Sequence, residues 1–427
     1  MVDASAPVPG SADEEFEREA AAAGLVVPKR RASDPWGALA IAIAIIVIVA
    51  GVGEVTGWLN LRTNAPVGGY KYQTCEGFPV RISGAITSDL DPSYATWLED
   101  SGSALSQSVG GCVEVNVSAP GSSSVTSVLA NSAYRFAATY VGPGAPGTPP
   151  AGGNVTVIPV ALTAVAIVYD LPGVSVPINL TGAALAGIYS GTIVRWNDSA
   201  LVALNPGIDL NGLPAIQVRY DADASSTSQV LTQFLSAQSP AWNDSVGSGP
   251  TVSWPTGAGV ASDSAMLAQV GSTPGAIGYI DLLGNAPSGV GIAQIENAAS
   301  TFVPPNAITA WIAAESFANA TDVTQADWSG FSLLGATGTG AYPIAMLTYV
   351  GVYRDMGVAY GGALSLTNAT WVLEYIYWLT SGATLAPLPA AFSAGAASQL
   401  NNETYDGTPI VPIDNETGET GGETGEF

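Results

Sequence analysis

Apolar runs rich in β-branched residues alternate with segments of helical spacing between residues 81 and 400. The run VIPVALTAVAIVY (157–169) carries no charge and predicts a strand that is buried on both faces. Residues 225–237 and 369–382 place their apolar side chains at the spacing of one helix face. This alternation predicts an α/β domain whose sheets are covered on both faces. With 10 Trp and 16 Tyr in 427 residues, we expect a large core divided between two lobes.

The charge balance excludes several classes of function. The chain has 11 Lys and Arg, 35 Asp and Glu and no His, which gives a net charge of −24. Triads, general bases and zinc or iron sites that need an imidazole are therefore excluded. A polyanion such as nucleic acid would be repelled. No paired carboxylates at catalytic spacing and no EF-hand-like spacing stand out, so we expect neither an enzyme nor a metal or cofactor site.

Residues 36–53 form an uncharged run, WGALAIAIAIIVIVAGVG, that is about long enough to cross a bilayer core of roughly 30 Å as a helix. Lys29, Arg30 and Arg31 precede this run, and Glu54 follows it. The positive-inside rule then makes residues 1–35 a cytoplasmic tail, residues 36–54 a transmembrane signal anchor and the remainder extracellular. A buried soluble helix and a cleaved signal peptide are the alternatives. The long, mixed-charge segment before the run favours an uncleaved, single-pass anchor in the cell membrane.

Other features agree with an extracellular location for the main domain. The two cysteines, Cys75 and Cys112, suit one structural disulfide, with two separate buried thiols as the alternative. Residues 55–80 resemble a stalk, and residues 401–427 are acidic and Gly-rich enough to predict a disordered tail. Nine Asn-X-Ser/Thr sequons, which are potential N-glycan acceptors, all follow the anchor: Asn116, Asn154, Asn179, Asn197, Asn243, Asn319, Asn368, Asn402 and Asn415.

The segment VRYDADASSTSQVLTQFL (218–235) carries the main signal for a binding site. A strand is expected to end near Arg219, and Ser225, Ser226 and Thr227 then open a helix. Three hydroxyls and several free backbone N–H groups at a helix N-terminus can bind a tetrahedral oxyanion. Ordinary N-capping by one of these serines is the alternative.

Several motifs in order along the chain resemble the extracellular phosphate-binding proteins that feed ABC-type phosphate transporters. They are Ile188-Tyr189-Ser190-Gly191, Trp196-Asn197-Asp198, Asn205-Pro206-Gly207, the 218–235 segment, TPGAIGYIDLL (273–283), AYPIAMLTYVGVYRDMG (341–357) and VLEYIYWLTSGATLAPLP (372–389). The resemblance implies a type II periplasmic-binding-protein fold over residues 81–400, in which two lobes joined by a hinge close on a ligand. The first lobe would hold residues 81–165 and 285–400, and the second lobe residues 166–284.

The resemblance also assigns ligand residues in this chain. In the family, hydroxyls and backbone amides hold phosphate together with one Arg and one Asp that accepts the ligand proton. The positions that match are Asp223, Ser225, Ser226 and Thr227 in the second lobe, Ser122 and Ser123 after Gly121 in the first lobe, and Thr87 or Ser88 in the first loop.

Two positions depart from the family pattern. Tyr140 stands where the proton-accepting Asp is expected, and Asp221 stands where the Arg is expected. Arg219 lies two residues earlier on the same side of an extended strand, so it either reaches the cleft from a shifted position or faces outward. Two carboxylates in the cleft would weaken the binding of a dianion.

We therefore expect a membrane-anchored solute-binding protein that captures phosphate or a related oxyanion and delivers it to ABC permease subunits. The alternative is a surface structural or adhesive glycoprotein that kept the fold and lost the ligand. A sensor that signals through the single helix ranks lower, because the 35-residue inner tail shows no output module. Since the acidic ectodomain cannot attract an anion over a distance, short-range hydroxyls, amides and helix ends must hold it.

Overall fold

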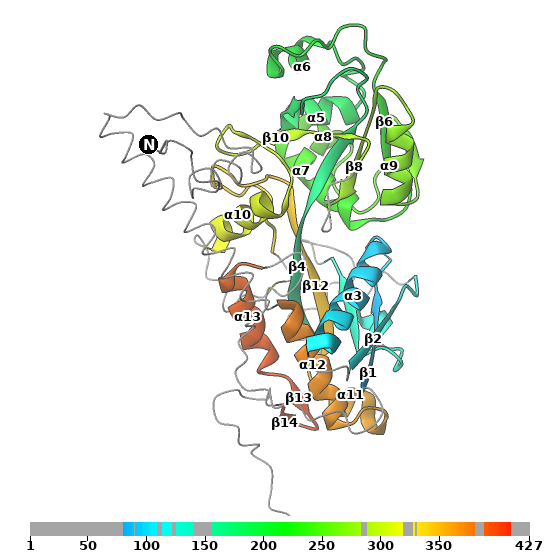
Figure 1. The fold of residues 1–427 in the computed structure, drawn as a ribbon, viewed down its shortest axis with the longest axis vertical. Coiled ribbons are helices and arrows are strands. Elements are labelled where there is room, and N and C mark those ends of the chain that lie inside the picture. The colour runs from blue at the N-terminus through cyan, green and yellow to red at the C-terminus, as the bar shows by residue number, and fades with distance from the viewer. Residues whose placement is uncertain are drawn as a thin grey trace, which may run out of the picture. The chain divides into compact units, whose positions relative to one another are not determined.

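The described residues form two α/β lobes that share one strand (Figure 1). The computed structural model describes residues 80–88, 90–108, 113–121, 125–140, 155–282, 288–318, 328, 331–380 and 388–410. The predicted α/β class and two-lobed architecture are confirmed in this part of the chain.

Strand β4 (Val155–Tyr169) connects the two lobes. Its first part, up to Ala164, pairs antiparallel with β12 (Ala345–Tyr353), and its last part, from Val165, pairs antiparallel with β8 (Ala276–Asp281). Nearly every residue of β4 is buried, as expected for an apolar run covered on both faces. Pro159 lies where the pairing with β12 shifts register, because proline has no N–H to donate to the ladder.

The first lobe has the strand order β2-β1-β3-β12-β4, in which β1, β2 and β3 are parallel. Helix α3 packs against β2, and α12 packs against β1 and β4. The elements are β1 (Val80–Ile86), α3 (Ser93–Ser108), β2 (Val113–Ser118), α4 (Val125–Leu129), β3 (Phe136–Thr139), α10 (Ala307–Ala318), α11 (Met356–Tyr360), the 3-10 helix η2 (Gly361–Ala363), α12 (Leu366–Thr380), α13 (Ala390–Leu400), β13 (Thr404–Tyr405) and β14 (Thr408–Pro409).

The second lobe has the strand order β4-β8-β6-β7, in which β8, β6 and β7 are parallel. A small separate sheet has the order β11-β10-β5, so the strands between residues 291 and 303, which were expected in the first lobe, pair with β4 and β5 of the second or with each other. The elements are β5 (Asn179–Leu180), α5 (Gly182–Tyr189), α6 (Ser199–Leu204), β6 (Gln217–Asp221), α7 (Ser226–Gln238), α8 (Pro240–Ser245), β7 (Ala258–Val260), α9 (Asp263–Gly271), β9 (Gly291–Ile292, paired with β4), β10 (Gln294–Glu296) and β11 (Phe302–Val303).

The C-terminal part differs from the expected tail. Residues 401–410 are folded, because Glu403 and Ile410 are buried and β13 pairs with β14. The carboxylate of Asp355 holds this hairpin by accepting hydrogen bonds from the backbone N–H groups of Asp406 and Gly407 and from the hydroxyl of Thr404. The polar composition of residues 401–410 gave no sign of these contacts, because Asp355 lies about fifty residues earlier in the chain.

Several predictions fall outside the described residues. These are the tail, anchor and stalk (1–79), both cysteines, Ser122 and Ser123, and residues 411–427. Among the described helices, none is long and apolar enough to cross a bilayer. The membrane anchor and the disulfide therefore remain predictions.

Candidate functional site

The start of helix α7 is built as the sequence predicted. Ser225 is the N-cap residue in extended conformation, and its hydroxyl oxygen accepts a hydrogen bond from the N–H of Ser228 at 3.0 Å. Ser226 and Thr227 follow as the first helical residues and are buried. Their backbone N–H groups belong to the set that a helix leaves without an intrahelical partner. This helix end can therefore donate hydrogen bonds to an anion.

A carboxylate of the protein itself already lies at this helix end. Asp221 is the last residue of β6, and its Oδ2 accepts hydrogen bonds from the hydroxyls of Ser225 at 2.6 Å and Ser228 at 3.4 Å. The hydroxyl of Tyr279 accepts the N–H of Asp221 and lies 2.7 Å from the hydroxyl of Ser228. Asp221 is only 8% exposed. Where the family pattern has an Arg, this chain therefore has a buried, hydrogen-bonded carboxyl group.

The surroundings of Asp221 disfavour its charged form. The pKa of Asp221 is raised to about 6: burial is the largest cause, the hydroxyls of Ser225 and Ser228 lower the pKa, and the negative charges of Asp91 and Asp223 raise it. Asp221 therefore exchanges its proton close to neutral pH.

Three more carboxyl groups lie at the carboxyl ends of strands or next to them, where the two lobes meet. Tyr94 of α3 donates its hydroxyl hydrogen to Asp281 at the end of β8, and the N–H of Asp263 donates to Asp91 at 3.2 Å. Both contacts join the first lobe to the second. Burial raises the pKa of Asp263 well above its usual range, and the charges of Asp281, Asp91 and Asp221 raise it further. We call Asp91, Asp221, Asp263 and Asp281 the acidic cluster.

The predicted first-lobe residues lie at the ends of β1 and β3. The hydroxyl and the N–H of Thr87 both donate to the carbonyl oxygen of Ala138, so this buried side chain links the two strands, while Ser88 is exposed. Tyr140, just after β3, is buried and lines a cavity that also contacts α7 of the second lobe through Val230. Tyr349 lines the same cavity, and its buried hydroxyl has no hydrogen-bond partner among the described residues.

The two remaining second-lobe predictions make no hydrogen bond to the helix end among the described contacts. Arg219 is half-buried and donates from Nη1 to the carbonyl oxygen of its neighbour Val218, and Asp223 is exposed in the loop between β6 and α7. Thus the structure gathers Ser225, Ser226 and Thr227 at one helix end, but no described contact joins them to Arg219 or to Thr87.

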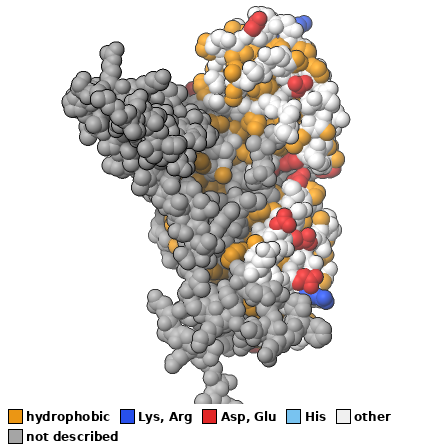
Figure 2. Space-filling model, viewed as in Figure 1, with side chains coloured by type: hydrophobic (Ala, Val, Ile, Leu, Met, Phe, Trp, Pro, Cys, Tyr) orange, Lys and Arg blue, Asp and Glu red, His pale blue; other side chains and the backbone are white. Residues whose placement is uncertain are grey.

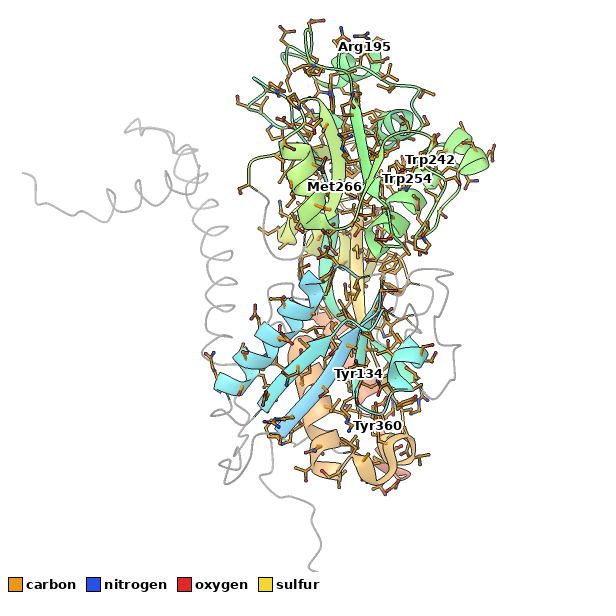
Figure 3. All side chains as sticks on the ribbon, turned by 90° about the vertical axis from the view of Figure 1, so that its right-hand side faces the viewer. Tyr134, Arg195, Trp242, Trp254, Met266 and Tyr360 are labelled. Carbon is orange, nitrogen blue, oxygen red and sulfur yellow. The ribbon has the colours of Figure 1, made fainter. Side chains whose placement is uncertain are left out.

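The basic side chains Arg81, Arg135 and Arg219 contact groups outside the acidic cluster. In the described part of the chain, the ion pair that the structure shows is Arg81 with Glu114, and Arg135 stacks over Tyr360 at 4.6 Å. Arg195 lies at the far end of the second lobe (Figure 3). On the face shown in Figure 2, acidic side chains extend over both lobes, and basic side chains show only near the two ends. The visible surface offers an anion no basic patch.

A cluster of aromatic rings supports the site from inside the second lobe. Trp254 contacts Tyr189, Tyr220, Trp242 and Tyr279, with ring centroids 5.2–5.9 Å apart. Trp242 and Trp254 lie side by side in Figure 3. Tyr279 also forms hydrogen bonds with Ser228 and Asp221, so the packing of this cluster holds Tyr279 in position next to the start of α7.

The sequence prediction missed six residues of this arrangement: Ser228, Tyr279, Tyr94, Asp91, Asp263 and Asp281. Ser228 had a local signal, because it stands three residues after the N-cap, where a capping side chain bonds. The other five had no signal that marked them as site residues. Tyr279 and Asp281 lie within the 273–283 motif, but the motif assigned them no role, and Asp281 is 187 residues from its partner Tyr94.

Two α/β lobes that meet at the carboxyl ends of their strands, and that share a strand, define a two-lobed binding protein. Residues 64–383 match the family model described as "PBP superfamily domain". The match covers most of the chain, which therefore belongs to the PBP superfamily.

Individual relatives agree with this assignment. The chain is 33% identical over 202 residues to the phosphate-binding protein PstS of Xylella fastidiosa strain Temecula1, covering 46% of this chain and 53% of that protein. It is 32% identical over 237 residues to the PstS protein of Methanocaldococcus jannaschii, covering 52% of this chain and 59% of that protein. The chain thus spans just over half the length of these curated relatives.

A solved structure shares the fold. A high-affinity periplasmic phosphate-binding protein (PfluDING) with bound phosphate matches with a TM-score of 0.50 at 19% identity, covering 74% of this chain and 92% of that chain. Together with the family match, this confirms the resemblance predicted from the sequence.

Proposed function

We propose that the protein is a solute-binding protein that captures phosphate or a related tetrahedral oxyanion between its two lobes. The observation that carries the proposal is the start of α7, where Ser225 caps a helix whose first N–H groups have no partner within the helix. It lies at the carboxyl edge of the second-lobe sheet, where open α/β folds bind their ligands. The relatives named as phosphate-binding proteins support the choice of ligand.

Titration calorimetry of the full chain with inorganic phosphate at pH 5.5 tests this proposal. We expect the wild type to bind, and the double variant Ser225→Ala/Thr227→Ala to lose at least about a hundredfold in affinity, because two hydrogen bonds to a charged group contribute about 1.5–3 kcal/mol each. The matched control is Ser239→Ala, which removes the N-cap of α8 in the same lobe and should leave affinity unchanged. Absence of binding heat with phosphate, arsenate, phosphonates and sulfate would contradict the proposal.

We further propose that an uncleaved anchor at 36–54 holds the domain outside the cell membrane, with residues 1–35 in the cytoplasm and delivery to ABC permease subunits. Cys75 and Cys112 would form one disulfide, and the sequons would accept N-glycans. The proposal rests on the uncharged run and the basic residues before it. Protease treatment of intact cells should degrade the domain and spare the N-terminal tail. Protection of both parts would overturn the extracellular location.

A ligand-free structural or adhesive role is the second candidate. It is favoured by Tyr140, which is 7% exposed and lines the cavity between β12 and α7. Under this alternative, phosphate and sulfate would give no heat with the wild type or with any variant at any pH.

A further inference from the structure

Four hydrogen bonds form a closed ring that crosses from the first lobe to the second. The hydroxyl of Tyr94 donates to the carboxylate of Asp281, and the N–H of Asp281 donates to the carboxyl group of Asp263 at 2.8 Å. The N–H of Asp263 donates to the carboxylate of Asp91 at 3.2 Å, and the carbonyl oxygen of Asp91 accepts the N–H of Tyr94 at 3.0 Å. We call Asp91, Tyr94, Asp263 and Asp281 the interlobe clamp.

The clamp is attached to strands on both sides. In the first lobe, the hydroxyl of Thr348 on β12 donates to the Tyr94 hydroxyl at 3.0 Å. The other oxygen of the Asp281 carboxylate accepts the hydroxyl of Thr163 on β4. Tyr94 and Thr348 are fully buried. Because a buried polar group that loses its partner costs free energy, these bonds favour forming and breaking together.

Asp91 also completes a helix end of the other lobe. Asp263 is the first residue of α9, and its N–H has no acceptor within that helix. The Asp91 carboxylate supplies the acceptor, and a negative charge at this helix end is favourable. Burial raises the pKa of Asp263 well above its usual range, which favours its neutral form and lessens the repulsion between the carboxyl groups. These contacts exist only when the lobes are together.

The clamp lies next to the proposed ligand site. The charge of Asp91 acts on Asp221, whose carboxylate accepts the Ser225 hydroxyl at the start of α7. Ser226 and Thr227 are buried in this arrangement of the lobes. Every bond of the clamp joins two groups of the protein, so it forms without help from a ligand. A ligand therefore reaches this helix end when the clamp opens.

We infer that the interlobe clamp holds the two lobes closed and limits the rate at which a ligand enters and leaves the cleft. The closure follows from contacts of the protein alone, whereas the effect on ligand exchange rests on the proposed oxyanion-binding function. Weakening the clamp destabilises the closed arrangement to the same extent with and without a ligand. The association and dissociation rate constants should then rise together, and the affinity should change little.

Hydrogen–deuterium exchange of the full chain without phosphate tests the closure. Tyr94→Phe keeps the ring and removes the hydroxyl, so amide exchange at the start of α9 should become about tenfold faster or more, because a hydrogen bond to a carboxylate is lost. The matched control is Tyr375→Phe. It removes another fully buried hydroxyl, which donates to the carbonyl oxygen of Leu98 in α3, but within the first lobe. The control should leave exchange at α9 unchanged. Equal exchange at α9 in Tyr94→Phe and the wild type would overturn the inference.

Stopped-flow measurement of phosphate binding to the same three proteins tests the effect on ligand exchange. For Tyr94→Phe, both rate constants should rise about tenfold while the dissociation constant stays within about threefold of the wild type. The control should match the wild type in both rates. A faster dissociation with an equal loss of affinity would overturn the inference, because Tyr94 would then support the ligand site itself.

A measurement on the wild type alone covers the case in which Tyr94→Phe fails to fold. The amide of Asp263 should exchange faster than the buried amides of β4, through an opening that exposes little surface and therefore hardly depends on low concentrations of urea. Exchange of Asp263 only at the rate of β4 would show that the lobes do not separate without unfolding, which contradicts the inference. If no form of the protein binds phosphate, the proposed function fails, and the exchange measurements still decide whether the clamp closes the lobes.

Discussion

Replacing Glu403 with glutamine is expected to stabilise the protein by about 3 kcal/mol at pH 7. Glu403 follows α13 and is 0% exposed, and its carboxyl oxygens have no hydrogen-bond partner among the described residues. Burial raises the pKa of Glu403 from 4.5 to about 8, because the lost hydration outweighs the favourable effects of the nearby Thr156 hydroxyl and the Arg354 charge, while Asp355 opposes them.

The sign of the pH dependence follows from proton binding. Between pH 4.5 and about pH 8 the folded protein holds a proton on Glu403 that the unfolded chain has lost. The free energy of unfolding therefore falls as pH rises through this window, by about 1.4 kcal/mol per unit. Glu403→Gln removes this dependence, so the variant and the wild type should be similar at pH 4.5 and diverge up to pH 8.

Urea denaturation at several pH values checks this result. Asp406→Asn is the control, because it removes an exposed carboxylate from the same hairpin and should not reproduce the divergence. An equal stability difference between Glu403→Gln and wild type at pH 5 and pH 8 would show that Glu403 does not titrate as a buried acid.

The long periodic segments of this fold were predictable from the sequence. The predicted strand at 157–169 is β4 (Val155–Tyr169), and the predicted helix at 225–237 is α7 (Ser226–Gln238). The segment at 369–382 corresponds to α12 (Leu366–Thr380). In each case the buried face of the strand or helix needs apolar side chains, so apolar residues recur in the sequence with the period of that element.

The candidate site was predictable only in part. Ser225 was found because N-caps have a local signature. Its engagement with Asp221 was not foreseen, because the sequence offered Asp221 only as a departure from an expected Arg. The direction of Arg219 was left open, and the structure shows it bonded to its neighbour's carbonyl oxygen. Hydrogen bonds between side chains depend on distances in the folded structure, and the spacing of residues along the chain does not give these distances.

The contact between the lobes was also not predictable from the sequence. Tyr94 receives a hydrogen bond from Thr348 of β12 and donates one to Asp281, so one hydroxyl joins three distant segments. No motif marks Tyr94 in the sequence. Its position follows from the topology, which brings α3 of the first lobe against the carboxyl ends of second-lobe strands.

Replacing Trp254 with alanine is expected to destabilise the protein by about 3 kcal/mol, near the lower end for a large aromatic side chain because Trp254 is only half-buried. The variant removes stacking on Tyr220 at 5.2 Å and on Tyr279 at 5.9 Å. Since Tyr279 bonds to Ser228 and Asp221, its release should also weaken oxyanion binding, which stability alone would not reveal. Trp311→Ala is the matched control, because Trp311 is 38% exposed on α10 and should lose about 1 kcal/mol or less with unchanged affinity. Urea denaturation and phosphate calorimetry on both variants separate the effects. An equal loss of stability in the two would show that the aromatic cluster does not support this lobe.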